Sequence, residues 1–230
     1  MHRILIALPI LFSLGLAGQT LERSVGLELA PQYTSSRITG GSNVTFRELE
    51  TIDSLESGAY AYGVGLVYEN RVERIGFTTG IRYSRTGLDR LRQALPDNQA
   101  FTEKVAAHYL AVPFDVNFYQ DVTPADRVLF SLGVGLQYHL GTRTERTLYS
   151  GENELETITV DNAALEYRPF LISFGTAVGY DRKLSVDYAL RVQPFFQFFL
   201  NGNLRPDTDF LANRNYYQAG IRLVIRRLFI

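Results

Sequence analysis

Eight segments of the chain alternate apolar and polar residues with a period of two, and this pattern constrains the fold most. Such alternation is typical of β-strands that expose one face to an apolar environment. In the first segment Val25, Leu27 and Leu29 share one face, and Gly26 and Glu28 share the other. The remaining segments span 59–68, 75–84, 108–121, 128–140, 170–180, 184–200 and 217–230. The sequence therefore predicts an all-β chain.

The two faces of these segments differ in a consistent way. One face is large and apolar, with Tyr and Phe near the strand ends, whereas the other is rich in Gly, Ala, Ser, Gln and a few charges. A soluble β-sandwich would pack its bulky face inward and expose the charged one. A narrow polar lumen surrounded by lipid accounts for both faces. We therefore expect an eight-stranded antiparallel up-and-down transmembrane β-barrel, with tyrosines forming interfacial girdles.

The connections between segments alternate in length. Those after the second, fourth and sixth segments are short, namely "ENRVER", "QDVTPADR" and "DRK". The other four are long and polar, spanning about 34–57, 85–107, 141–165 and 201–215. Short periplasmic turns and long extracellular loops are typical of outer-membrane barrels. This predicts a cell outer membrane protein with both mature termini in the periplasm.

The first 18 residues have the layout of a secretory signal peptide. His2 and Arg3 precede an apolar run over 4–16, and small residues follow at Ala17 and Gly18. The run is short for a membrane-spanning helix, which needs about 20 apolar residues. We expect a signal peptide over 1–18 and one β-barrel domain over 19–230.

The composition excludes several kinds of chemistry and one class of partner. The 230 residues contain no cysteine, which excludes disulfides, a thiol nucleophile and Cys-ligated metals. The net charge of −1 gives no basic field for nucleic acid. We expect no cofactor.

The residue patterns of two long connections predict secondary structure within them. The segment 143–160 alternates on both sides of a turn-like cluster at 150–153, so strands five and six are expected to extend past the membrane as a ribbon. Leu88, Leu91 and Leu95 lie at helical spacing, so "GLDRLRQAL" is expected to form one or two helical turns.

Four prolines interrupt the expected strands. Proline cannot donate a ladder hydrogen bond, and a closed barrel has no edge where it could be placed. A bulge or bend is therefore expected at Pro31, Pro113, Pro169 and Pro194.

The segment "YLAVPFDVNF" resembles a strand motif, Tyr-Leu-Glu-Ile-Pro-(apolar)3, of the PorT-like outer-membrane β-barrel family common in Bacteroidota. Tyr109, Leu110, Val112 and Pro113 match, whereas Ala111 stands where that family often has Glu. The Gly-rich strands before it also resemble the family. The resemblance implies an outer-membrane barrel and allows a non-catalytic subunit of a PorT-type protein secretion complex.

Charged residues on the small face are expected to meet inside the barrel. An eight-stranded barrel is just wide enough for side chains to fill it, and unpaired buried charge is costly. The interpretation is a structural salt-bridge network; the alternative is a gated ion path or a polar ligand site. The expected network comprises Glu28, Arg82, Asp115, Asp187, Arg191, Arg222 and Arg226.

Catalysis finds little support in the residue types. His139 is expected to point inward and His108 outward, so the two cannot pair. We see no Ser-His-Asp spacing and no metal-ligand cluster, so a lipid-modifying enzyme remains only an alternative.

The partners expected from the sequence are those of the envelope. Long loops on a rigid scaffold favour surface binding or an envelope-structural role, with a secretion complex or an extracellular partner as candidates. Lipid and lipopolysaccharide should surround the barrel. The last strand resembles the terminal signal read by the barrel-assembly machinery, carried by Gly220, Leu223, Phe229 and Ile230.

Overall fold

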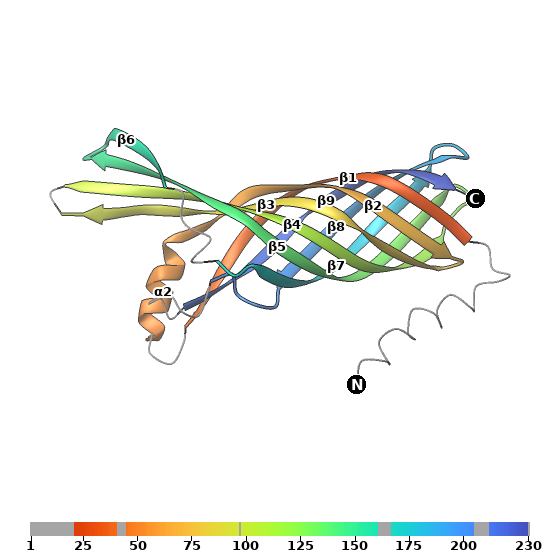
Figure 1. Ribbon diagram of the computed structural model, residues 1–230, viewed down its shortest axis with the longest axis horizontal. Coiled ribbons are helices and arrows are strands. Elements are labelled where there is room, and N and C mark those ends of the chain that lie inside the picture. The colour runs from red at the N-terminus through yellow and green to blue at the C-terminus, as the bar shows by residue number, and fades with distance from the viewer. Residues whose placement is uncertain (1–20, 41–44, 97, 161–166, 205–211, 230) are drawn as a thin grey trace.

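The chain forms an antiparallel barrel closed by eight strands (Figure 1). The computed structural model describes residues 21–40, 45–96, 98–160, 167–204 and 212–229. Its elements are β1 (Leu21–Gly40), α2 (Phe46–Ser54), β2 (Glu56–Val72), β3 (Ile75–Leu95), β4 (Gln99–Asp121), β5 (Asp126–Ser150), β6 (Asn153–Val160), β7 (Phe170–Lys183), β8 (Tyr188–Phe199) and β9 (Ala212–Phe229). The β4–β5 pairing closes the ring, and β6 pairs with β5 outside it. The predicted eight-stranded barrel is confirmed.

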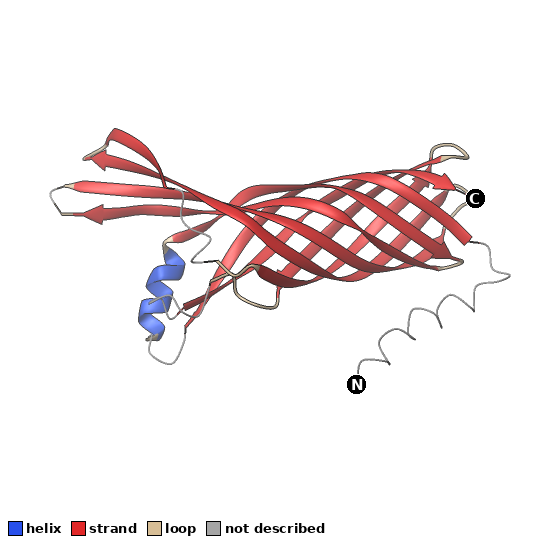
Figure 2. Cartoon of the chain, viewed as in Figure 1, coloured by secondary structure: helices blue, strands red, loops and turns tan. Residues whose placement is uncertain are grey.

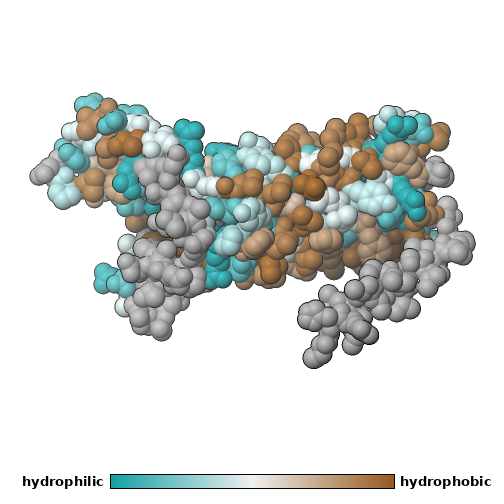
Figure 3. All heavy atoms as spheres, viewed as in Figure 1, coloured by the Kyte–Doolittle hydropathy of each residue, from teal (hydrophilic) through white to brown (hydrophobic). Residues whose placement is uncertain are grey.

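The outer surface of the barrel carries an apolar belt (Figure 3). On β5, Val128, Phe130 and every second residue up to Tyr138 are exposed. Ten residues of a strand tilted by about 45° rise about 25 Å, which matches the apolar band of outer-membrane barrels. The predicted tyrosines lie at its two ends: Tyr33, Tyr60, Tyr62 and Tyr138 toward the long connections, and Tyr68, Tyr180 and Tyr188 toward the short ones.

The inner face carries small residues because the strands and side chains crowd there. A Cβ on Gly80 would lie 2.1 Å from the carbonyl oxygen of Leu66, so this position on β3 has no room for a side chain. The polar residues of the same face are buried in the lumen.

Two of the three short connections are shorter than expected, and the third lies farther along the chain than "DRK". Only residues 73–74, 122–125 and 184–187 lie outside the strands (Figure 2). The strands continue into "ENRVER" and "DRK" because their ladders extend as far as Val72↔Ile75 and Lys183↔Ala189. Conversely, the seventh strand of the ring begins at Tyr188 and not at Leu184.

At the other end, four strands project beyond the barrel as a single sheet. The β3–β4 ladder runs to Leu95↔Gln99, and the β4–β5 ladder runs to Gln99↔Ser150. β6 then pairs along β5, with the turn at Gly151. The predicted ribbon is thus confirmed, although it is formed by β5 and β6 with β3 and β4 beside them. We call this sheet (88–95, 99–106, 143–150 and Asn153–Val160) the blade.

The helical prediction for "GLDRLRQAL" is wrong. These residues belong to β3, since pairing with β4 satisfies more backbone groups than one or two isolated helical turns would. A helix forms instead at α2, where Thr45 and Glu48 make a reciprocal capping box. The pattern Thr-x-x-Glu was the available signal.

The prolines are accommodated almost without bulges. No register shift occurs at Pro31, Pro113 or Pro194; on one side of each, the ladder skips two residue pairs and resumes in the same register. The predicted bulge at these three positions is therefore wrong. Pro113 faces Gly135 on β5, and by register Gly80 on β3, so glycines leave space for its ring. Only Pro169 lies at a bend, just before β7.

The start of β1 and the end of β9 lie at the same end of the barrel, opposite the blade (Figure 1). The expected signal peptide falls outside the described residues, as does Ile230. Within the described ranges, no helix has the length and apolar character needed to cross a membrane.

Candidate functional sites: a filled lumen and a projecting blade

Glu69 is the hub of the charge network in the lumen. Its carboxylate lies 2.9 Å from Arg191 and 2.8 Å from Arg226, and accepts a 2.6 Å hydrogen bond from the Tyr119 hydroxyl. Asp181 pairs with both arginines from the opposite side. Only 2% of Glu69 is exposed. Two acids and two arginines thus neutralise each other across the lumen.

A second charged layer lies nearer the middle of the barrel. Arg82 Nε lies 2.5 Å from Glu28 Oε1, and Arg222 Nη1 donates to Asp115 Oδ2 at 3.0 Å. The cavity beside these pairs measures about 20 Å³, which is room for one water molecule. This layer therefore fills the lumen.

A third group closes the end that carries the short turns. Arg127 donates two hydrogen bonds to Glu22, at 3.0 and 3.1 Å. Arg127 and Arg71 both lie near Asp121, at 3.1 and 3.3 Å.

The structure brings together six of the seven predicted lumen residues and corrects the seventh. Asp187 is exposed in the 184–187 turn, because its strand begins one residue later. The third group was not predicted, and neither were Glu69 and Asp181 of the hub, since these two lay in segments assigned to turns. Counting the period of two onward from Gly63 and Gly65, or from Ser173 and Gly175, would have placed both inside.

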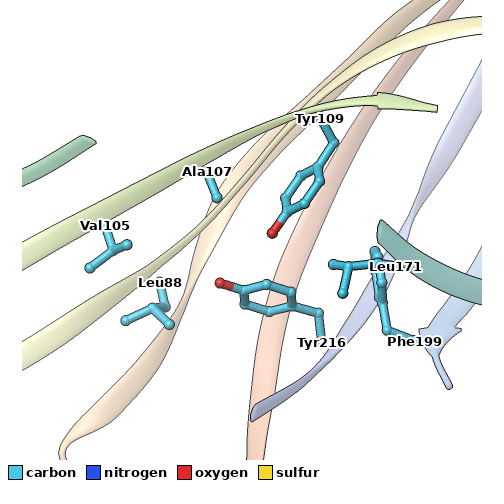
Figure 4. Packing of buried hydrophobic residues seen from close by; sticks show 7 residues of the cluster. All are labelled: Leu88, Val105, Ala107, Tyr109, Leu171, Phe199 and Tyr216. Carbon is cyan, nitrogen blue, oxygen red and sulfur yellow. The ribbon is translucent and has the colours of Figure 1, made fainter. Parts of the chain in front are cut away.

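An apolar layer blocks the lumen toward the blade (Figure 4). Figure 4 shows Tyr109 and Tyr216 with their hydroxyls directed into the same space, beside Leu88 and Leu171. The complete cluster is Leu88, Val105, Ala107, Tyr109, Leu171, Phe199 and Tyr216. Above the charged layers, the barrel is thus filled by packed side chains.

The two histidines point to opposite sides, as predicted. His139 is buried, stacks on Tyr167 with ring centroids 5.0 Å apart, and lies 2.8 Å from the Thr142 hydroxyl. His108 lies on the outer face with Nδ1 2.5 Å from the Tyr83 hydroxyl. Among the described residues, no three His, Asp or Glu side chains are placed to hold a metal ion.

Ion pairs stiffen the base of the blade. Glu103 lies 2.5 Å from both Arg90 and Arg146, and Glu56 pairs with Arg214. Burial raises the pKa of Glu103, but the hydrogen bond from Arg146 and the charge of Arg90 outweigh it and hold the pKa below its usual range.

Beyond the ion pairs at its foot, the blade is a sheet whose strands are linked by hydroxyl and cation–π contacts. The side chains of Thr147 and Thr157 hydrogen-bond at 3.0 Å across β5 and β6, and Arg92 lies over the Tyr149 ring at 4.9 Å. Within the described ranges, β6 has a strand neighbour on one side only. Glu154 and Glu156 give this edge an acidic character.

Three residues of the expected assembly signal lie on the closing strand β9. Leu223 and Phe229 face outward, and Gly220 pairs with Gln32. The recognition itself remains a prediction.

Comparisons with known proteins agree with this architecture. Residues 18–206 match the family model "Outer membrane protein beta-barrel domain". No curated protein sequence matches the chain. Similar solved structures cover most of the chain at low sequence identity and with TM-scores below 0.5. Neisserial surface protein A has 11% identity and a TM-score of 0.43, with 87% of this chain and 96% of that one covered.

Two further structures of this kind come from other bacteria. OprG of Pseudomonas aeruginosa has 12% identity and a TM-score of 0.39, with 91% and 95% covered. Ail of Yersinia pestis, described as an attachment invasion locus protein, has 10% identity and a TM-score of 0.33, with 90% and 98% covered. The family match spans most of the barrel, and the belt and ring are those of a membrane-spanning sheet. The chain therefore belongs to the outer-membrane β-barrel domain family and is an outer-membrane protein.

Proposed function

We propose that this protein is a non-catalytic surface-binding scaffold, which holds the blade outside the cell on a closed barrel. In this orientation the short turns and both mature termini lie in the periplasm. The filled lumen supplies rigidity and carries no solute. The protein acts through recognition by the blade.

The observation that carries this proposal is the blade itself. It extends four strands beyond the ring, and among the described residues its β6 edge has no strand partner on the outer side, where an incoming chain could pair. Extended peptides commonly bind by adding a strand to such an edge, where main-chain hydrogen bonds supply affinity. The acidic residues Glu154 and Glu156 favour a basic extended segment in the partner.

The lumen supports a scaffold rather than a pore. Each acid of the inner layers faces an arginine, and the apolar layer lies above them. The alternative of a PorT-type secretion subunit uses the same blade as a docking surface. The two roles differ only in the partner recovered.

The proposal is tested by shortening the blade. Residues 147–157 are replaced by a two-residue Asn-Gly turn, and intact cells carrying either form are treated with a cross-linker before purification and mass spectrometry. We expect the shortened protein to keep its heat-dependent gel migration and to lose the cross-linked partner. Secretion components among the lost partners would identify the subunit role. Unchanged cross-links in the shortened protein would contradict blade recognition.

A further inference from the structure

A groove of about 410 Å³ opens on the outer face of the barrel, at the foot of the blade. Its floor is formed by Gly87 and Ala106, which leave a hollow between larger neighbours on β3 and β4. Around it stand Arg85, His108 and Arg143. The groove faces away from the lumen, so its occupant must come from the surroundings of the barrel.

The groove begins where the apolar belt ends. On β3, Tyr83 is the last aromatic residue of the belt, and Arg85 is the next residue on the same face. On β4, His108 follows Leu110 in the same way and lies opposite Arg85. Tyr60, 85% exposed, stands beside them. The first polar row above the hydrocarbon therefore carries the cationic Arg85 beside the His108 ring, at the depth where lipid headgroups lie.

In the groove, the cationic Arg85 lies next to the apolar belt, and the carboxylates lie farther from it. Among the described residues, no carboxylate forms an ion pair with Arg85. Asp89 and Glu145 lie farther out, on either side of Lys104 in the ladders. Glu145 is already engaged, 3.3 Å from Arg143. An anionic group entering from the membrane side would meet Arg85 before it met an acid.

We propose that this groove binds the phosphorylated headgroup of a membrane glycolipid, with its acyl chains lying along the belt below. A phosphate bound there accepts charge-assisted hydrogen bonds from the Arg85 guanidinium, with Arg143 at the far wall. Tyr60 and Tyr83 border the sugar and the upper acyl chain. Assigning the lipid to the outer leaflet rests on the proposed orientation, whereas binding itself does not.

The test uses the full mature chain and bisphosphorylated lipid A as the probe. The purified protein is placed in nanodiscs that contain this lipid in both leaflets, or its dephosphorylated form, and then extracted and examined by native mass spectrometry. Because the lipid is present in both leaflets, the result does not depend on the orientation of the barrel. A loss of lipid binding would therefore leave the proposal for the blade untouched.

We expect the phosphorylated lipid to be retained at least fivefold more than the dephosphorylated one. The double variant Arg85→Gln/Arg143→Gln should remove that preference. Arg227→Gln should keep it, because this exposed arginine lies on the outer face at the opposite end of the barrel. Equal retention of both lipids, or equal loss in the Arg227→Gln control, would overturn the proposal. Heat-dependent gel migration confirms that each variant is folded.

Discussion

At the scale of single residues, the ion pairs of Glu69 matter most for the stability of the lumen, because its carboxylate neutralises two buried arginines. Glu69→Gln keeps the shape of the side chain, but among the described residues it leaves Asp181 as the one carboxylate paired with Arg191 and Arg226. Breaking a buried ion pair from one side costs about 3–5 kcal/mol. We expect the free energy of unfolding, measured by urea titration in detergent micelles, to fall by about that amount.

Asp187→Asn is the matched control for this substitution. Asp187 was expected in the lumen but is exposed in a turn, so its loss of charge should change the free energy of unfolding by less than about 0.5 kcal/mol. Equal destabilisation by the two substitutions would contradict the lumen network described above.

At the scale of elements, the stability of the blade depends on pH, because the ion pairs of Glu103 hold it where it joins the barrel. The pKa of Glu103 is lowered in the folded protein, so the stability it contributes is fully present above its unfolded pKa of about 4.3. That contribution is lost as the pH falls through the lowered folded value. We expect backbone amides of 99–106 and 143–150 to lose protection from hydrogen exchange at pH 3 relative to pH 7, after correction for intrinsic rates.

Glu103→Gln supplies the control for this prediction. Its blade amides should be less protected at both pH values and should show little further change between them. Full protection of the original blade at pH 3 would show that Arg90 and Arg146 do not hold it through this carboxylate.

The elements also show where sequence reasoning succeeds and where it stops. The period of two predicted the ring and the inward phase of Arg82 and Arg222, because lipid and lumen impose opposite demands on alternate residues. It did not predict the strand character of "GLDRLRQAL", since β4 overrides a local helical spacing. The convergence of Glu69 with Arg191 and Arg226 depends on strands far apart in the chain, so only the closed ring reveals it.

At the scale of the whole molecule, a filled barrel should not conduct. In the described part of the chain, the charged layers and the apolar layer occupy the lumen, and the cavity beside the second charged layer measures about 20 Å³. We expect planar-bilayer recordings of the purified protein to show no steady conductance. Large, stable current steps would mean that the lumen opens and would revive the gated ion path.

In the proposed orientation, the barrel lies in the outer membrane with its blade outside the cell and its short turns in the periplasm. The chain contains no cysteine, so a cysteine introduced by substitution is the one thiol that can be labelled, and its labelling reports the exposure of that position. Thr157→Cys places a thiol on the blade, and Ser185→Cys places one in a short turn at the other end. Both are treated in intact cells with a membrane-impermeant maleimide. We expect labelling of Thr157→Cys at once and of Ser185→Cys only after the outer membrane is permeabilised. The reverse pattern would show that the blade lies in the periplasm.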